Sequence, residues 1–372
     1  MKKVLTLVLV VSMIFGLAVS AGAKPVNIGI SIWSSKDTLG SECKRLIDAA
    51  AAALGVETQW VDQAHISEQV TASAETLALA GCDGIIICNS ASAEMGSVIK
   101  TCDENEVYVA QFFRVIDPKA NPDEYAQASA SPYYVGAVHE SEFDNGKTLV
   151  TILAGQKGCR KIGLEGWEPG DATFLGRWAG YQAGVEEWNA AHPDDKVTLL
   201  DPQYGRTTTD TGRATAEAII DANPDIDALI VAGGAGDTLL GAIAAIEAKG
   251  LTGKIAVVST DFLPDLDEKL KTGAMAAESG GHYADPFFAF LMVYNTIQGK
   301  YPTSTTGFHD MVFPYMYVAS SEDYANYAKY FTGNQLPYTA DEIKALAELS
   351  YDDLAAACAK LSVEDVVARH AK

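Results

Sequence analysis

The chain has 372 residues, a formal net charge of −22 and 48% hydrophobic residues. That length suits about two domains, each large enough to bury its own core. The ordinary apolar content excludes a disordered chain. The acidic balance argues against nucleic-acid binding and against electrostatic docking on anionic lipid. None of the six cysteines has Cys-x-x-Cys spacing, so a zinc ribbon or thioredoxin-like site has no support.

The first 23 residues are typical of a cleaved secretory signal. A basic Met1-Lys2-Lys3 start precedes an almost wholly apolar run at 4–19 and a small-residue Ala21-Gly22-Ala23 cleavage motif. The competing interpretation is a membrane anchor, but the run is short for a bilayer, which needs about 20 residues. We therefore expect export to the periplasm or the outside after cleavage near Ala23. We also expect buried free thiols rather than structural disulfides.

From residue 26 onward, apolar runs alternate with segments of helical spacing. The first series predicts strands at 26–33, 56–61, 83–88 and 107–112 and helices at 39–54, 66–80 and 93–104. A second series predicts strands at 160–164, 196–200, 227–231 and 254–258 and helices at 174–190, 211–221 and 239–248. Near-continuous apolar strands between helices indicate parallel sheets covered on both faces. The repeated order indicates two similar units.

The remaining segments connect or extend these series. They comprise a proline-punctuated loop at 117–132, a strand at 133–139, helices at 142–154 and 286–298, a strand at 311–318 and a tail of short helices from Ser321. The expected fold class is therefore α/β, with two doubly wound parallel-sheet lobes and a C-terminal helical extension.

Aromatic and charged side chains follow the strands of both series. Ligands of open parallel sheets bind beyond the carboxyl ends of the strands. Rings stack on the apolar faces of a small polyhydroxylated ligand, and its hydroxyls bond to carboxylates and guanidinium groups. The alternative to ligand binding is partial burial in the core for the tryptophans. For the arginines it is a solvated or ion-paired position on the surface. The candidates are Trp33, Asp37, Phe113, Arg114, Trp167, Asp171, Arg177 and Asp261.

These features together resemble the periplasmic sugar-binding proteins of the ribose- and galactose-binding type, the substrate receptors of ABC transporters. The resemblance covers about residues 26–318. Arg177-Trp-Ala-Gly-Tyr181 is similar to the family's Arg-x-x-Gly-aromatic segment, whose arginine binds sugar hydroxyls. Phe112-Phe113-Arg114 resembles the segment that usually ends in Asp-Arg, with Phe113 in place of the aspartate. Val257-Val-Ser-Thr-Asp261 is similar to Val-Gly-Phe-Asp, whose aspartate is a ligand residue, and Asp37 falls in the first binding loop.

Two segments depart from that pattern. Residues 232–237 lack the usual Asn-Asp, and Gly280-Gly281-His282 stands where a Gln or Asn is common at the third hinge. Both departures concern residues that select the ligand. A nucleoside, an amino-acid-like compound or a signalling molecule that reports to a chemosensor therefore stays an alternative to a monosaccharide.

The resemblance implies capture by closure of two lobes joined by hinge strands, and no cofactor or metal. It implies a lobe of residues 24–138 with 282–310 and a lobe of 139–281 with 311–320, whereas residues 321–372 lie outside the resemblance and are expected to form a helical extension. Trp33, Asp37 and Arg114 would bind from one lobe and Arg177 and Asp261 from the other, with Trp167 as a second stacking face. We expect a monomer whose partners are a small-molecule ligand, with a sugar as the first choice, and a membrane permease.

An enzyme is not expected, because the common catalytic motifs are missing. The chain has no Gly-x-Ser-x-Gly elbow and no complete Gly-x-Gly-x-x-Gly, and His139-Glu140 is not followed by the second histidine of a zinc protease motif. A secreted carbohydrate-active enzyme with paired carboxylates is the less favoured alternative.

Overall fold

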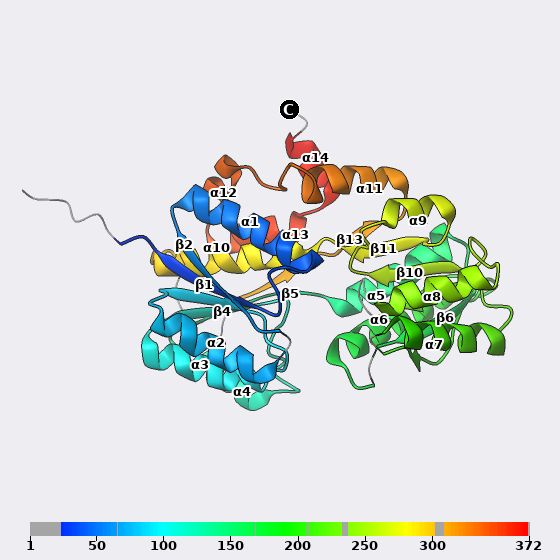
Figure 1. Ribbon diagram of the computed structural model, residues 1–372, viewed down its shortest axis with the longest axis horizontal. Helices are drawn as coiled ribbons and strands as arrows, with labels where there is room; N and C mark the ends of the chain where they lie inside the picture. Colours follow the sequence, from blue (N-terminus) through cyan, green and yellow to red (C-terminus); the bar gives the residue numbers. More distant parts are fainter. Residues whose placement is uncertain are drawn as a thin grey trace, which may run out of the picture.

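The computed structural model describes residues 24–370, apart from residues 65, 168, 207, 233–236 and 302–308. The expected signal segment lies outside the described residues. Figure 1 shows two lobes side by side, each built on a sheet covered by helices, with a helical tail lying over both. The expected fold class is confirmed.

The first lobe is a six-stranded sheet in the order β12-β5-β4-β3-β1-β2, with every neighbouring pair parallel. Its elements are β1 (Asn27–Ile32), α1 (Thr38–Leu54), β2 (Glu57–Asp62), α2 (Ser67–Leu79), β3 (Gly84–Ile87), α3 (Glu94–Asn105), β4 (Tyr108–Phe112), α4 (Pro122–Ala130), β5 (Tyr134–Glu140), η3 (His282–Ala284), α10 (Asp285–Ile297) and β12 (His309–Phe313). Helices α1 and α10 cover one face of the sheet, and α2 and α3 cover the other (Figure 1).

Strand β3 shows why this sheet is buried on both faces. All four of its residues are buried, as expected of an apolar strand between two helical layers. Close packing requires a glycine at position 84, because a Cβ built on Gly84 would lie 2.4 Å from the Val293 side chain of α10. The glycine therefore lets the most apolar helix of the lobe lie directly on the sheet.

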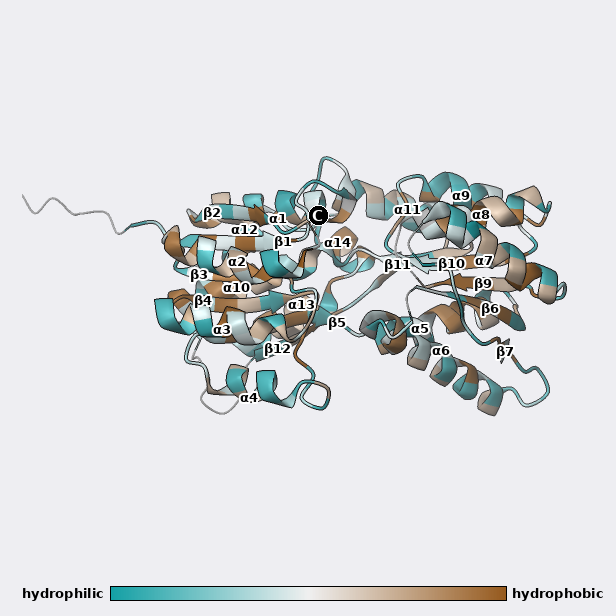
Figure 2. Ribbon diagram, turned by 60° about the horizontal axis from the view of Figure 1, so that its bottom comes forward, coloured by the Kyte–Doolittle hydropathy of each residue, from teal (hydrophilic) through white to brown (hydrophobic). Residues whose placement is uncertain are grey.

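The second lobe repeats the plan with the sheet order β13-β11-β10-β9-β6-β7, and β8 also pairs with β6. Only the β11–β13 pair is antiparallel among the described strands. Its elements are α5 (Glu142–Thr151), η2 (Ile152–Gln156), β6 (Lys161–Gly166), α6 (Ala172–Ala191), β7 (Thr198–Leu199), β8 (Gln203–Tyr204), α7 (Thr209–Ala222), β9 (Ala228–Val231), α8 (Asp237–Ala248), β10 (Ala256–Thr260), α9 (Leu266–Thr272), β11 (Ala277–Gly280) and β13 (Met316–Val318). Figure 2 shows hydrophobic strands at the centre of each lobe.

The C-terminal tail contacts both lobes. It consists of α11 (Ser321–Tyr327), η4 (Ala328–Thr332), α12 (Ala340–Leu346), α13 (Tyr351–Lys360) and α14 (Val363–His370). Helix α11 packs on α9 and β13 of the second lobe, whereas α12 packs on α1 and α13 on β12 of the first. The Tyr327 ring lies 4.5 Å from Phe262 and stacks on Phe331, whose ring lies 6.2 Å from Tyr283. The tail thus joins the two lobes through one buried apolar cluster.

The structure corrects four details of the expected organisation. The predicted strand at 311–318 is two strands, because Pro314 offers no N–H to a ladder and the chain turns there. Residues 311–313 consequently pair with β5 in the first lobe, not in the second. Residues 139 and 140 likewise complete β5 of the first sheet, and the loop at 117–132 contains α4.

All six cysteines are buried free thiols. Among the described residues, no helix has the length and apolar character needed to cross a membrane. Within the same residues, no group of His, Cys, Asp and Glu side chains could hold a metal ion.

Candidate functional site

Before the tail, the chain crosses between the two sheets three times. The first crossing joins β5 to α5 at 140–142, the second joins β11 to η3 at 280–282, and the third joins β12 to β13 at 313–316. Gly281 has φ +77°, and a Cβ built there would lie 2.8 Å from the Met316 sulfur. The second and third crossings are therefore in contact, and glycine permits both the left-handed turn and the close approach.

A row of aromatic rings runs from the end of β1 to the third crossing. Trp33 and Phe113 have ring centroids 5.6 Å apart, Phe113 and His282 5.3 Å, and His282 and Tyr315 5.2 Å. These spacings are typical of favourable tilted and edge-to-face aromatic contacts. The row connects two of the predicted residues, Trp33 and Phe113, to the crossings.

The turn after β4 presents Arg114 beside this row. Phe113 has φ +59°, a conformation that a bulky residue rarely adopts and that surrounding contacts must hold. Its backbone N–H donates to Asp285 Oδ1 at 3.2 Å, and Arg114 Nη1 donates to the Phe113 carbonyl at 2.7 Å. Arg114 is exposed, and its charge interacts with Glu140 and Glu142. The guanidinium is thus available to a ligand.

Arg177 of α6 lies at the crossings as well, but the protein already uses most of its donors. Its Nε donates to Glu142 Oε2 at 2.5 Å and its Nη1 to the Ala232 carbonyl at 2.8 Å. Its Nη2 lies 3.3 Å from both Glu142 Oε1 and the Tyr315 hydroxyl. Only 5% of the side chain is exposed, which rules out a solvated helix face. Arg177 ties α6 to α5 and to the third crossing.

Asp261 follows β10 and faces the second crossing. Its φ of +72° turns the chain at the strand end, and its N–H donates to the Ser279 carbonyl. Asp261 Oδ1 lies 3.2 Å from Nε2 of His282. His282 is buried, so this aspartate and this histidine connect the second lobe to the aromatic row.

Two buried carboxyl groups lie beneath Phe113 and Arg114. Glu140 ends β5, Asp285 begins α10, and their side chains are hydrogen-bonded to each other. That contact requires a shared proton, since two ionised carboxylates only accept. Burial raises the pKa of Asp285 well above its usual range, and the neighbouring Glu140 raises it further. Burial likewise raises the pKa of Glu140.

Six of the eight sequence candidates therefore belong to one connected group at the crossings. Asp37 joins it through Trp33 Nε1, which donates to Asp37 Oδ2 at 2.5 Å, while its Oδ1 caps α1 by accepting from Gly40 N. The connected candidates are Trp33, Asp37, Phe113, Arg114, Arg177 and Asp261.

The other two candidates, Trp167 and Asp171, make contacts of a different kind among the described residues. Asp171 is the N-cap of α6, and its Oδ1 accepts from Phe174 N at 2.8 Å. Trp167 is partly buried against the core of the second lobe, which is the core-packing alternative considered for it.

Five residues of the group were missed by the sequence analysis as binding candidates. They lie in the crossings or next to them. The sequence feature that could have identified them is a polar or aromatic residue directly after a strand from which the chain passes to the other lobe. His282 was noticed only as a departure from the family pattern. The missed residues are Glu140, Glu142, His282, Asp285 and Tyr315.

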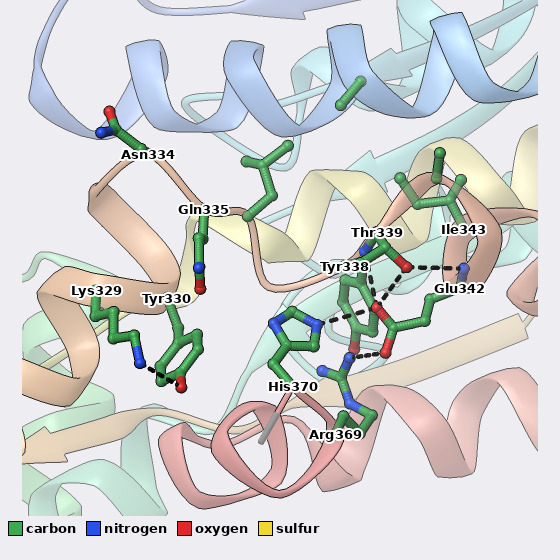
Figure 3. Close-up of a pocket in the computed structure, with 13 residues that line it drawn as sticks. Lys329, Tyr330, Asn334, Gln335, Tyr338, Thr339, Glu342, Ile343, Arg369 and His370 are labelled. Carbon is green, nitrogen blue, oxygen red and sulfur yellow. Dashed lines mark hydrogen bonds and ion pairs between the residues drawn. The ribbon is translucent and has the colours of Figure 1, made fainter. Parts of the chain in front are cut away.

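A separate pocket of about 730 Å³ lies between α1 and the tail (Figure 3). Its charged groups bind one another, since Glu342 accepts from Arg369 Nη1 at 2.6 Å and lies 3.1 Å from His370 Nε2. Burial would raise the pKa of Glu342, but the hydrogen bonds from Thr339 N, Arg369 and His370 lower it to about 2. This pocket is the weaker ligand-site candidate because its carboxylate is already saturated.

Comparison with known proteins identifies the family. Residues 28–287 match the family model described as "Periplasmic binding protein domain", so the chain belongs to that family. The fold is the two-lobe fold of type I periplasmic binding proteins. A comparison with curated proteins returned no match.

Solved structures show the same fold. An ABC transporter periplasmic solute-binding protein from Actinobacillus succinogenes with bound D-allose is 19% identical with a TM-score of 0.67, and the match covers 82% of this chain and 100% of that one. A solute-binding protein from Bacillus halodurans with bound myo-inositol is 19% identical with a TM-score of 0.65, covering 83% and 100%. A glucose-galactose binding protein from Geobacillus stearothermophilus is 17% identical with a TM-score of 0.64, covering 81% and 99%.

Proposed function

We propose that the chain is the exported solute-binding receptor of an ABC transporter, and that it captures a monosaccharide between its two lobes by hinge closure. The observation that carries the proposal is the connected group of aromatic and charged side chains at the three crossings. Family membership supports a solute-binding role, and the sugars and the inositol bound by the structural neighbours favour a hydroxylated ligand.

The group can supply both kinds of contact that a sugar needs. Trp33 and Phe113 offer ring faces and edges for the apolar side of a pyranose or furanose. Arg114 donates hydrogen bonds to hydroxyls, and Asp261 accepts them. Because these side chains come from both lobes, a ligand that touches all of them favours the closed arrangement over the open one.

Hinge closure would bend the backbone at the three crossings, and the tail between η4 and α12 would have to follow because it contacts both lobes. A ligand bound to both lobes stabilises the closed form by its extra contacts there, and the closed form is then presented to the permease. The capture involves no bond breaking, so no residue is assigned a catalytic role. The periplasm is the compartment that this function implies.

The test is thermal unfolding of residues 24–372 with monosaccharides, polyols, nucleosides and amino acids. A ligand at 100 times its dissociation constant adds about 2.7 kcal/mol of stability, which raises the melting temperature of a chain this size by several degrees. Arg114→Ala should abolish the rise, and the exposed Arg213→Ala should keep it. A rise only with nucleosides or amino acids would replace the ligand class, and turnover of a glycoside would overturn the proposal.

A further inference from the structure

We infer that the C-terminal tail is a strap behind the hinge, that it holds the two lobes apart, and that it thereby lowers the affinity for the ligand. The strap consists of residues 321–339, which comprise α11, η4 and the connection to α12. The inference goes beyond the proposed function, although its ligand readout rests on that function. It follows from where the tail touches each lobe and from the side of the crossings on which it lies.

The two lobes are apart in this structure except at the crossings and the tail. Among the described helices and strands, none of the first lobe makes an extensive contact with one of the second. The tail makes such contacts with both lobes, since α11 packs on α9 and β13 while α12 packs on α1. Packing through the tail is therefore the main side-chain interaction that favours this open arrangement.

The strap is joined to the second lobe by an aromatic contact and a hydrogen bond. The Tyr327 ring lies 4.5 Å from the ring of Phe262, which follows β10. The Tyr324 hydroxyl donates to the Pro264 carbonyl at 3.3 Å. Tyr327 is only 5% exposed, so its separation from Phe262 would expose apolar surface and cost free energy.

The strap is joined to the first lobe by hydrogen bonds to its backbone. Arg45 of α1 donates to the carbonyls of Phe331 and Gly333. The buried Tyr283 hydroxyl also donates to the Phe331 carbonyl, at 2.8 Å. A charged donor and a buried donor on one short segment fix this end of the strap to the first lobe.

The strap and the candidate ligand site lie on opposite sides of the same backbone. Asp261 and His282 belong to the site, where the His282 ring lies 5.3 Å from Phe113. The residues that follow them, Phe262 and Tyr283, contact the aromatic rings of the strap instead. Figure 1 shows the same order, with the tail above β5, β11 and β13. The crossings therefore lie between the ligand side chains and the strap.

Rotation about the crossings moves these two sides in opposite directions. Closure brings the lobes together on the ligand side and separates them on the strap side, so it stretches the contact of Tyr327 with Phe262. The strap thus raises the free energy of the closed form relative to the open form. Because the ligand favours the closed form, its apparent affinity falls with the fraction of chains that can close.

Calorimetric titration of Tyr327→Ala with a ligand identified by thermal unfolding tests the inference. The Tyr327 ring contacts Phe262 and Phe331 rather than the aromatic row of the site. We expect the variant to bind about three- to tenfold more tightly than wild type. Leu354→Ala, at a buried position of α13 on the first lobe, is the matched control and should keep the wild-type affinity. Unchanged or weaker binding by folded Tyr327→Ala overturns the inference.

Arg45→Met tests the other end of the strap without removing a ring from the tail. The methionine keeps an apolar stem but donates no hydrogen bond to the strap. This variant should also bind more tightly than wild type, whereas Lys44→Gln, which breaks an exposed pair with Asp48 on the same helix, should not. If Tyr327→Ala fails to fold, Arg45→Met decides the question, and an unchanged affinity then overturns the inference.

A measurement without ligand separates this inference from the proposed function. Spin labels on Leu79→Cys of α2 and Glu247→Cys of α8 report the distance between the lobes, because both positions are exposed and the native thiols are buried. Adding Tyr327→Ala or Arg45→Met should broaden the distance distribution. An unchanged distribution overturns the inference. If no ligand of the panel binds, the proposed function fails, and this distribution alone judges the strap.

Discussion

At the scale of single residues, the role of Arg177 was ambiguous from the sequence, and its buried ion pair with Glu142 explains that role. The Arg-x-x-Gly-aromatic segment directed attention to this arginine as a ligand residue, with a solvated helix face as the alternative. The structure shows a third outcome, since the guanidinium is buried and bound by the protein itself. Its partner Glu142 could not be named from sequence because pairing across two helices depends on how they pack.

Arg177→Ala should therefore destabilise the fold in addition to any effect on ligand binding. The change leaves Glu142 without its counter-ion in a largely buried position, which costs about 3 kcal/mol. Urea unfolding of the two proteins measures the difference. Lys147→Ala, which breaks the more exposed pair with Glu187, is the matched control and should cost much less, because exposed ion pairs contribute little to stability. Equal costs for the two substitutions would contradict the structural role of Arg177.

Glu165 provides a second prediction at this scale, and it concerns pH. Neither of its carboxylate oxygens has a hydrogen-bond partner among the described residues, and burial raises its pKa to about 9. The unfolded chain loses this proton near pH 4.5 while the folded chain keeps it. Stability is therefore fully present below about pH 4.5 and is lost progressively as the pH rises to about 9.

Glu165→Gln removes that dependence because the amide stays neutral. Relative to wild type, the variant should gain stability between pH 5 and pH 8, by at most about 1.4 kcal/mol per pH unit. Unfolding curves at several pH values measure the gain, with the exposed Glu57→Gln as control. A stability difference that stays flat across this range would show that Glu165 is ionised in the folded protein.

At the scale of elements, the alternating apolar runs were sufficient to predict most strands and helices of the two lobes, but not α4, β8, α9 or β11. The misplaced elements have local causes that a pattern of apolar residues does not encode. The run at 311–318 is continuous in hydropathy, yet Pro314 divides it between two sheets. The short strand β8 and the helix α4 carry too few apolar residues to stand out.

The tail shows the same limit, since its helices could be predicted but their docking could not. Phe331 is 0% exposed, and the Arg45 side chain donates to the carbonyls of Phe331 and Gly333. Phe331→Ala should cost about 3–5 kcal/mol, because the ring fills the apolar contact between the lobes. Thermal unfolding measures the loss, and the exposed Lys344→Ala in the same tail is the control. A loss no larger than that of the control would show that the tail is not integral to the core.

At the scale of the whole molecule, the crossings matter more than either lobe. Apart from the antiparallel β13, each sheet is an ordinary parallel α/β layer, and candidates such as Trp33 and Arg114 could be predicted because strand ends meet at one edge of each sheet. Glu140, His282, Asp285 and Tyr315 could not be predicted as binding residues, since their proximity exists only once the three crossings lie together. The residues of the site therefore meet only in the two-lobe arrangement. Hinge closure requires the same arrangement.

The most direct test of this account is small-angle X-ray scattering of residues 24–372, with and without a saturating ligand identified by thermal unfolding. Capture between the lobes predicts that the ligand decreases the radius of gyration, because the lobes rotate toward each other about the crossings. Arg114→Ala at the same ligand concentration should leave the radius unchanged. A wild-type chain that binds its ligand fully while its scattering profile stays the same would contradict capture by closure at the crossings.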